Sequence, residues 1–134
     1  MNEDLHFPYF KGQEITKIEN GKPLPLILKF SNGGLVIECP WRLKLNGRII
    51  VGQTDFQTPS SADEYLNTLI THLAGHEITD ICWWKEAEIL RLKTANQATL
   101  DIFHNSASFE GWELFGENDF SFISLPGGEV ENIS

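Results

Sequence analysis

The sequence contains only two cysteines, Cys39 and Cys82, and no C-x-x-C pair. Zinc ribbons and thioredoxin-like redox sites need paired cysteines, so neither is expected. A disulfide framework is also unnecessary, because a chain of 134 residues can bury an adequate core without cross-links. We therefore predict two reduced thiols, with no disulfide and no structural metal.

Long apolar runs are missing as well. No run approaches the roughly 20 residues that a membrane-spanning helix needs. The N-terminal stretch MNEDLHFPYFKG is acidic and lacks the apolar segment of a signal peptide. We therefore expect a cytoplasmic protein with no membrane partner.

Basic residues are scarce: 10 Lys and Arg stand against 19 Asp and Glu, for a formal charge of −9. Such a balance disfavours nucleic acids and anionic membranes as partners, since both are bound through Lys and Arg. Residues 94–134 hold no Lys or Arg and seven acids: Asp101, Glu110, Glu113, Glu117, Asp119, Glu129 and Glu131. This segment either keeps the protein soluble or forms an acidic docking face for a basic protein.

Motifs for catalysis and for phosphate binding are also missing. The sequence has no G-x-S-x-G elbow, and its Gly-Gly pairs lack the frame of a phosphate-binding loop. Carboxylate pairs such as Glu86 and Glu88 are typical of exposed strand positions. We therefore predict no cofactor and no enzymatic activity. The alternative is a small enzyme or ligand-binding domain whose site is assembled only in three dimensions.

Two histidines, His72 and His76, have the i, i+4 spacing of helical zinc ligands. However, Gly75 is expected to end the helix between them, and no third ligand follows a known spacing. Cys82 is a conceivable nucleophile, but no recognised spacing pairs it with His76. Neither pattern predicts a site.

Alternating apolar residues predict strands at 24–30, 35–45 and 48–51. Asn-Gly pairs at 32–33 and 46–47 separate them and favour tight hairpins. The middle strand is the clearest, and Pro40 places it at an edge or a bulge. Its predicted core-facing residues are Leu35, Ile37, Cys39, Trp41 and Leu43.

One amphipathic helix is predicted at 61–74. Ser61 and Glu64 fit a capping box, and apolar residues recur at helical spacing. Leu66, Leu69 and Leu73 are expected to face the core. Later strands are predicted at 78–85, 86–93, 99–103, 111–115 and 119–125, separated by turn-forming residues.

These elements predict an α+β fold: a mainly antiparallel sheet of about eight strands packed around one helix. The order is three strands, the helix and then five strands, which excludes a doubly wound parallel sheet. We expect one domain over 1–134, with loosely held ends at 1–14 and 126–134. The strand 78–85, with apolar residues on both faces, is expected to be central and covered by the helix.

Two stretches carry a resemblance to known proteins. The first contains Ile37-Glu38-Cys39-Pro40-Trp41-Arg42, and the second runs from Gly111-Trp112-Glu113-Leu114-Phe115-Gly116 to Leu125-Pro126-Gly127-Gly128-Glu129. They resemble a family of small uncharacterised bacterial proteins with an I-E-x-P-x-R strand and a W-x-L-x-G…L-P-G-G-E ending. In size, charge and class, the chain is also loosely similar to bacterial toxin-immunity proteins.

The resemblance implies no catalytic residues. It favours a non-enzymatic protein-binding module, such as an immunity protein that neutralises a basic toxin domain by binding it. The predicted partner-binding residues are the acidic cluster and its tryptophan: Glu110, Trp112, Glu113, Glu117 and Asp119. The oligomeric state and the identity of the partner stay open.

Overall fold

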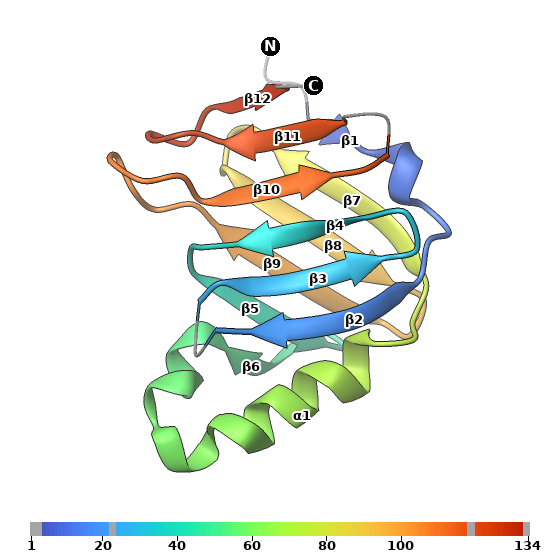
Figure 1. The fold of residues 1–134 in the computed structure, drawn as a ribbon, viewed down its shortest axis with the longest axis vertical. Coiled ribbons are helices and arrows are strands. Elements are labelled where there is room, and N and C mark those ends of the chain that lie inside the picture. Colours follow the sequence, from blue (N-terminus) through green and yellow to red (C-terminus); the bar gives the residue numbers. More distant parts are fainter. Residues whose placement is uncertain (1–3, 22–23, 118–119, 133–134) are drawn as a thin grey trace.

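The computed structural model describes residues 4–21, 24–117 and 120–132. Within these residues every strand pair is antiparallel, and the strands form two six-stranded sheets (Figure 1). Sheet 1 has the order β1-β7-β8-β9-β5-β6 and sheet 2 the order β12-β11-β10-β4-β3-β2. Sheet 1 contains β1 (Leu5–His6), β7 (Ile78–Trp84), β8 (Ile89–Thr94), β9 (Ala98–Phe103), β5 (Trp41–Leu45) and β6 (Arg48–Gly52). Sheet 2 contains β12 (Val130–Asn132), β11 (Ser121–Ser124), β10 (Trp112–Phe115), β4 (Gly33–Ile37), β3 (Leu26–Phe30) and β2 (Ile15–Asn20).

The predicted long strand 35–45 is two strands in two sheets. β4 pairs with β3 and β10, whereas β5 pairs with β6 and β9. The connection Glu38–Pro40 carries the chain from sheet 2 to sheet 1, at the position where Pro40 lacks a ladder donor. The alternation of buried residues continues through the connection, since Ile37, Cys39 and Trp41 are all buried.

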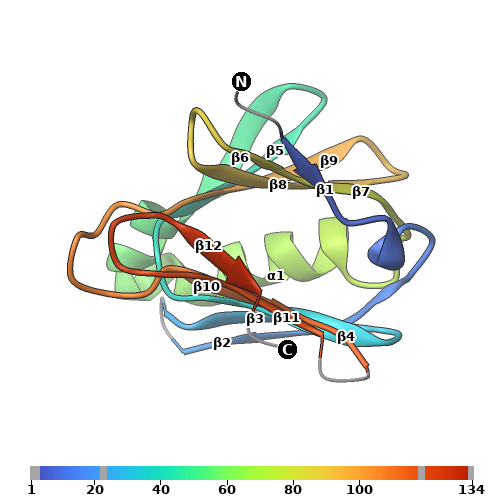
Figure 2. The same ribbon diagram turned by 90° about the horizontal axis from the view of Figure 1, so that it is seen from above.

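The core lies between the two sheets (Figure 2). The predicted inward-facing residues of both strands belong to it, and Glu38 is exposed as expected. Leu69 and Leu73 are fully buried with them, and Leu66 packs against the same cluster half-buried. This part of the prediction is confirmed, because a period of two fixes the face whether or not the strand is continuous.

Helix α1 (Ala62–Leu73) closes one open side of the gap between the sheets, beside β2 and β6 (Figures 1 and 2). The chain reaches it through two short 3-10 helices, η2 (Gln53–Gln57) and η3 (Pro59–Ser61). The predicted capping box does not form: Ser61 has a helical backbone and makes no side-chain cap bond. Gly75, with φ of +81°, follows the helix end as predicted.

Aromatic residues pack near the opposite side of the gap. The segment 4–14, expected to be loosely held, contains η1 (Pro8–Phe10) and buries Phe7 and Phe10. Their rings contact Phe120 and Phe122 at centroid distances between 5.0 and 6.4 Å. These contacts tie the N-terminal segment to β11, a strand more than one hundred residues later in the chain.

The fold is therefore α+β in the broad sense, but one eight-stranded sheet around a helix is wrong. β7 lies next to the short edge strand β1, and the helix does not cover it. Two sheets cover each other's apolar faces instead, which leaves the helix only the side of the gap. Among the described residues, no helix combines the length and apolar character that crossing a membrane requires.

Candidate functional site

The outer face of sheet 1 contains a carboxylate that is completely buried. Asp101 lies between the core residues Leu100 and Ile102 on β9, so its side chain points away from the core. Its exposed fraction is nevertheless 0%. Strand register explains this burial, because Arg42 of β5 and Arg91 of β8 flank Asp101 on either side.

Both arginines bind this carboxylate. Arg91 donates from Nε to Oδ1 at 2.6 Å and from Nη2 to Oδ2 at 3.2 Å, and Arg42 donates from Nε to Oδ2 at 3.0 Å. Lys44 Nζ lies 3.8 Å from the same Oδ2. The carboxylate of Asp101 is thus surrounded by the positive charges of Arg42, Lys44 and Arg91.

Burial is the largest single influence on the carboxyl group of Asp101 and raises its pKa. The hydrogen bonds and charges of Arg91 and then Arg42 outweigh it, so the pKa lies below the ordinary 3.8. The hydrogen bond to Asp101 in turn raises the pKa of Arg91. The group is therefore a permanent ion cluster and not an acid–base catalyst near neutral pH.

An aromatic ring lies against each of the two arginines. The guanidinium of Arg91 lies over the Trp84 ring at 4.4 Å, and that of Arg42 lies over the Phe103 ring at 4.8 Å. Such cation–π contacts fix the planes of both guanidinium groups. We call the set Trp84, Arg91, Asp101, Arg42 and Phe103 the arginine–aromatic face.

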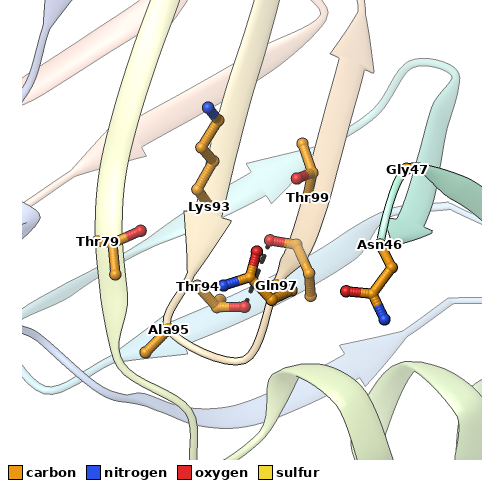
Figure 3. Close-up of a pocket in the computed structure, with 9 residues that line it drawn as sticks. Asn46, Gly47, Thr79, Lys93, Thr94, Ala95, Gln97 and Thr99 are labelled. Atoms are coloured by element: carbon orange, nitrogen blue, oxygen red, sulfur yellow. Dashed lines mark hydrogen bonds between the residues drawn. The ribbon is translucent and has the colours of Figure 1, made fainter.

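A hollow of about 350 Å³ adjoins this face at the hairpin ends of sheet 1 (Figure 3). Thr79 and Thr99 direct their hydroxyl groups toward the strand between them, which carries Lys93 (Figure 3). Asn46 lies at the β5–β6 turn, on the far side of Thr99. Lys93 has no ion-pair partner among the described residues, and its nearest acidic register neighbour, Asp80, contacts His6 instead.

Next to the arginine–aromatic face lie a thiol, an imidazole and a carboxylate. Cys82 Sγ is 3.8 Å from His6 Nε2, and His6 Nδ1 is 3.3 Å from Asp80 Oδ1. This order of groups is that of a nucleophile, a base and an orienting acid. However, Cys82 is only 3% exposed, and burial followed by the charges of Asp4 and Asp80 raises its thiol pKa.

Cys39 is unsuited to nucleophilic chemistry for a similar reason. It is free and buried in the connection between the sheets. Burial, followed by the charge of Glu38, raises the pKa of its thiol to about 12. Since the thiolate is the reactive form, neither cysteine is activated.

We therefore expect both cysteines to react slowly with iodoacetamide at pH 7. The rate should be at least about tenfold below that of the same thiols in denaturant, because both are buried and protonated. Mass spectrometry of the labelled chain against time measures it. Fast labelling of Cys82 that His6→Ala abolishes would instead reveal an activated thiol.

A serine–histidine pair lies at the opposite sheet. Ser124 Oγ hydrogen-bonds His104 Nδ1, and His104 Nε2 lies 2.7 Å from the carbonyl oxygen of Phe109. Since a carbonyl only accepts, Nε2 carries a proton, and in the neutral imidazole Ser124 therefore donates to Nδ1. Ser124 is 1% exposed, so the pair fastens the loop before β10 and offers no accessible nucleophile.

The predicted partner-binding residues do not gather at one point. Glu110 precedes β10, Glu113 lies on the outer face of sheet 2, and Glu117 follows the strand. Glu113 accepts a hydrogen bond of 2.9 Å from Ser121. Trp112 is 2% exposed in the core, so it cannot serve as a surface anchor. Asp119 lies outside the described residues.

The histidines with zinc-like spacing are separated by the helix end, and His76 Nε2 contacts the Thr71 carbonyl at 3.3 Å. Across 4–21, 24–117 and 120–132, no three His, Cys, Asp or Glu side chains form a group suited to a metal ion. Sequence reasoning missed the cluster of Arg42, Arg91 and Asp101. The signal available in the sequence was that each of these three residues takes an outward position in a strand of alternating apolar residues.

Two six-stranded antiparallel sheets and one helix define an α+β protein. The chain belongs to the family described as a family of unknown function (DUF6188), which matches residues 7–134. This agrees with the expected membership of an uncharacterised family, and the family description assigns no activity. Neither the curated proteins nor the solved structures gave a significant match.

Proposed function

We propose that this protein is a non-enzymatic protein-binding module. The groups with catalytic potential among the described residues are buried or neutralised: Cys39, Cys82, Ser124 and Asp101. The hollows found there lie beside hairpins and loops at the surface. The accessible chemistry lies instead on the two broad outer sheet faces, which suit a protein partner better than a small substrate.

The proposed partner is a basic protein, as for an immunity protein that neutralises a toxin domain. Its proposed docking surface is the outer face of sheet 2 over strands β10, β11 and β12. We call this surface the acidic face. The observation that carries this proposal is a row in register across β10, β11 and β12, namely Glu113, Ile123 and Glu131. Two acids thus flank a half-buried aliphatic side chain, with Val36 and Phe115 beside Glu113.

Half-buried apolar side chains within a charged rim are typical of binding surfaces. Basic partners would be steered there, since opposite potentials accelerate the encounter. Two residues of the acidic segment 94–134 do not contribute. Asp101 is neutralised in sheet 1, and Trp112 lies in the core.

The test measures association kinetics with a basic protein, such as any toxin domain encoded in a neighbouring gene, over a series of salt concentrations. In the variant Glu113→Lys/Glu131→Lys, the association rate at low salt should fall by about tenfold or more. The dissociation rate should change less, because charges at a rim act mainly on encounter. Circular dichroism checks that the variant is folded.

A matched control reverses two exposed acids elsewhere, Glu64→Lys on helix α1 and Glu77→Lys at the β-bridge with Glu14. These changes also raise the net charge but lie outside the acidic face. The control should keep a rate close to that of the wild type after correction for net charge. Equal losses in both variants would show that only total charge matters and would remove the acidic face from the proposal.

A further inference from the structure

The arginine–aromatic face differs in charge from the rest of this acidic protein. Around Asp101, the outer face of sheet 1 brings together Arg42, Lys44, Arg91 and Lys93 against two acids, Asp80 and Asp101. Four bases and two acids give these strand rows a charge of +2 in a chain of −9, while Asp4 and Glu86 lie beside Trp84. We infer that this face is a second binding surface, which docks an acidic polypeptide segment.

The arginines retain donors for a partner. Arg42 uses only Nε on Asp101, and Arg91 uses Nε and Nη2. Among the described residues, the other guanidinium N–H groups have no hydrogen-bond acceptor. Planar guanidinium groups with free N–H pairs match the geometry of carboxylates. A carboxylate-bearing segment therefore fits the unused donors.

The surface is also held in place before binding. Asp101 binds both guanidinium groups, and the rings of Trp84 and Phe103 each lie against one of them. Binding to ordered side chains costs less conformational entropy than binding to mobile ones. Trp84 is 37% exposed, and tryptophan and arginine are the residues that most often dominate binding energy at interfaces.

The hollow in Figure 3 continues the basic surface along the strands, past the arginines to the next residues on the outer face. Lys93 and Lys44 lie on either side of Thr99 in register across β8, β9 and β5. Their ammonium groups and the hydroxyls of Thr79 and Thr99 can all donate to an oxygen anion. The hollow is thus suited to an acidic side chain of a segment that crosses the arginines (Figure 3).

An acidic polypeptide fits better than a single-stranded nucleic acid. Nucleic-acid binding on a sheet face uses open aromatic rings as stacking platforms. Here the guanidinium groups of Arg91 and Arg42 already occupy one face each of Trp84 and Phe103. A net charge of −9 also opposes a long phosphate backbone more strongly than a short acidic segment.

The experiment measures binding of a fluorescein-labelled octaglutamate peptide by anisotropy at low and physiological salt. The wild type should bind the peptide with a Kd below about 1 mM at low salt, and the affinity should fall as the salt concentration rises. Lys44→Gln/Lys93→Gln should weaken binding at least about fivefold, and so should Trp84→Ala. Thermal melts confirm folding; since all three side chains lie on the outer face, the core stays intact.

The matched control is Lys17→Gln/Lys29→Gln, which removes the same number of bases from the outer face of sheet 2. It should bind the peptide as the wild type does. Equal weakening in both double variants, or no peptide binding at about 1 mM, would overturn the inference. Tighter binding of octathymidylate than of the peptide would also overturn it, in favour of a nucleic acid. The wild type could instead self-associate without binding the peptide. If Lys44→Gln/Lys93→Gln abolished that self-association, the partner would be a second copy of this chain.

Discussion

Asp101→Asn should lower the free energy of unfolding by about 2–4 kcal/mol, a value near the cost of removing one partner from a buried ion pair. Asparagine keeps the shape but loses the charge that holds Arg42 and Arg91. Arg91 is mostly covered, so its guanidinium would stay partly desolvated without a counter-ion. Arg42 is more accessible to water, which places the expected loss below that of a fully enclosed pair. Urea unfolding followed by tryptophan fluorescence measures the difference.

The same residue makes stability depend on pH in the acid range. Its pKa is lowered in the folded protein, so the unfolded chain binds this proton first as pH falls. The stabilisation is complete above the ordinary, unfolded pKa of 3.8 and is lost as pH falls through the lower, folded value. Asp101→Asn should therefore show a shallower loss of stability with acid than the wild type.

Glu19 provides the matched control. Its carboxylate also contacts two cations, Lys17 at 3.1 Å and Lys29 at 3.6 Å, but all three side chains are largely exposed. Glu19→Gln should leave the free energy of unfolding unchanged within error, because solvent screens exposed pairs. Equal effects of the two substitutions would show that the buried cluster adds no more than a surface ion pair.

Local alternation predicted the inward and outward faces of the central strands correctly. The face of each residue between Leu35 and Leu43 followed from period two alone. Alternation cannot show which strand lies beside which, and it did not reveal that the chain changes sheet at Glu38–Pro40. Two strands in different sheets and one long strand have the same pattern of buried residues.

The strands that the sequence missed are short or irregular. β1 has two residues and β12 has three, too few for any periodicity to be visible. β2 is longer, but a bulge between Ile15 and Lys17 shifts its register. The bulge breaks the alternation of period two on which strand prediction relies.

The arginine–aromatic face could not be predicted, because its members meet only through strand register. Arg42 and Asp101 are 59 residues apart in sequence. Asp101 counted as one of seven acids in a segment without Lys or Arg, yet its charge is neutralised by arginines from outside that segment. Total charge over a stretch of sequence therefore misjudged the local charge on the surface.

Leu69→Ala should cost about 2–5 kcal/mol in the free energy of unfolding, the range for removing a buried leucine side chain. Leu69 is fully buried where helix α1 closes the gap between the sheets. Truncation would leave a cavity that two hydrogen-bonded sheets cannot readily collapse to fill. Chemical denaturation at constant pH measures the loss.

Ile70 is the control on the same helix, one position later and 40% exposed. Ile70→Ala truncates an aliphatic side chain of similar size on the solvent side of the helix. It should lower the free energy of unfolding by less than about 1 kcal/mol. The helix is short, and its 12 residues would not be stable in isolation. Its structure therefore depends on the contacts of Leu69 and Leu73 with the core. If Leu69→Ala cost no more than Ile70→Ala, the helix would be a dispensable attachment, and the two sheets alone would hold the fold.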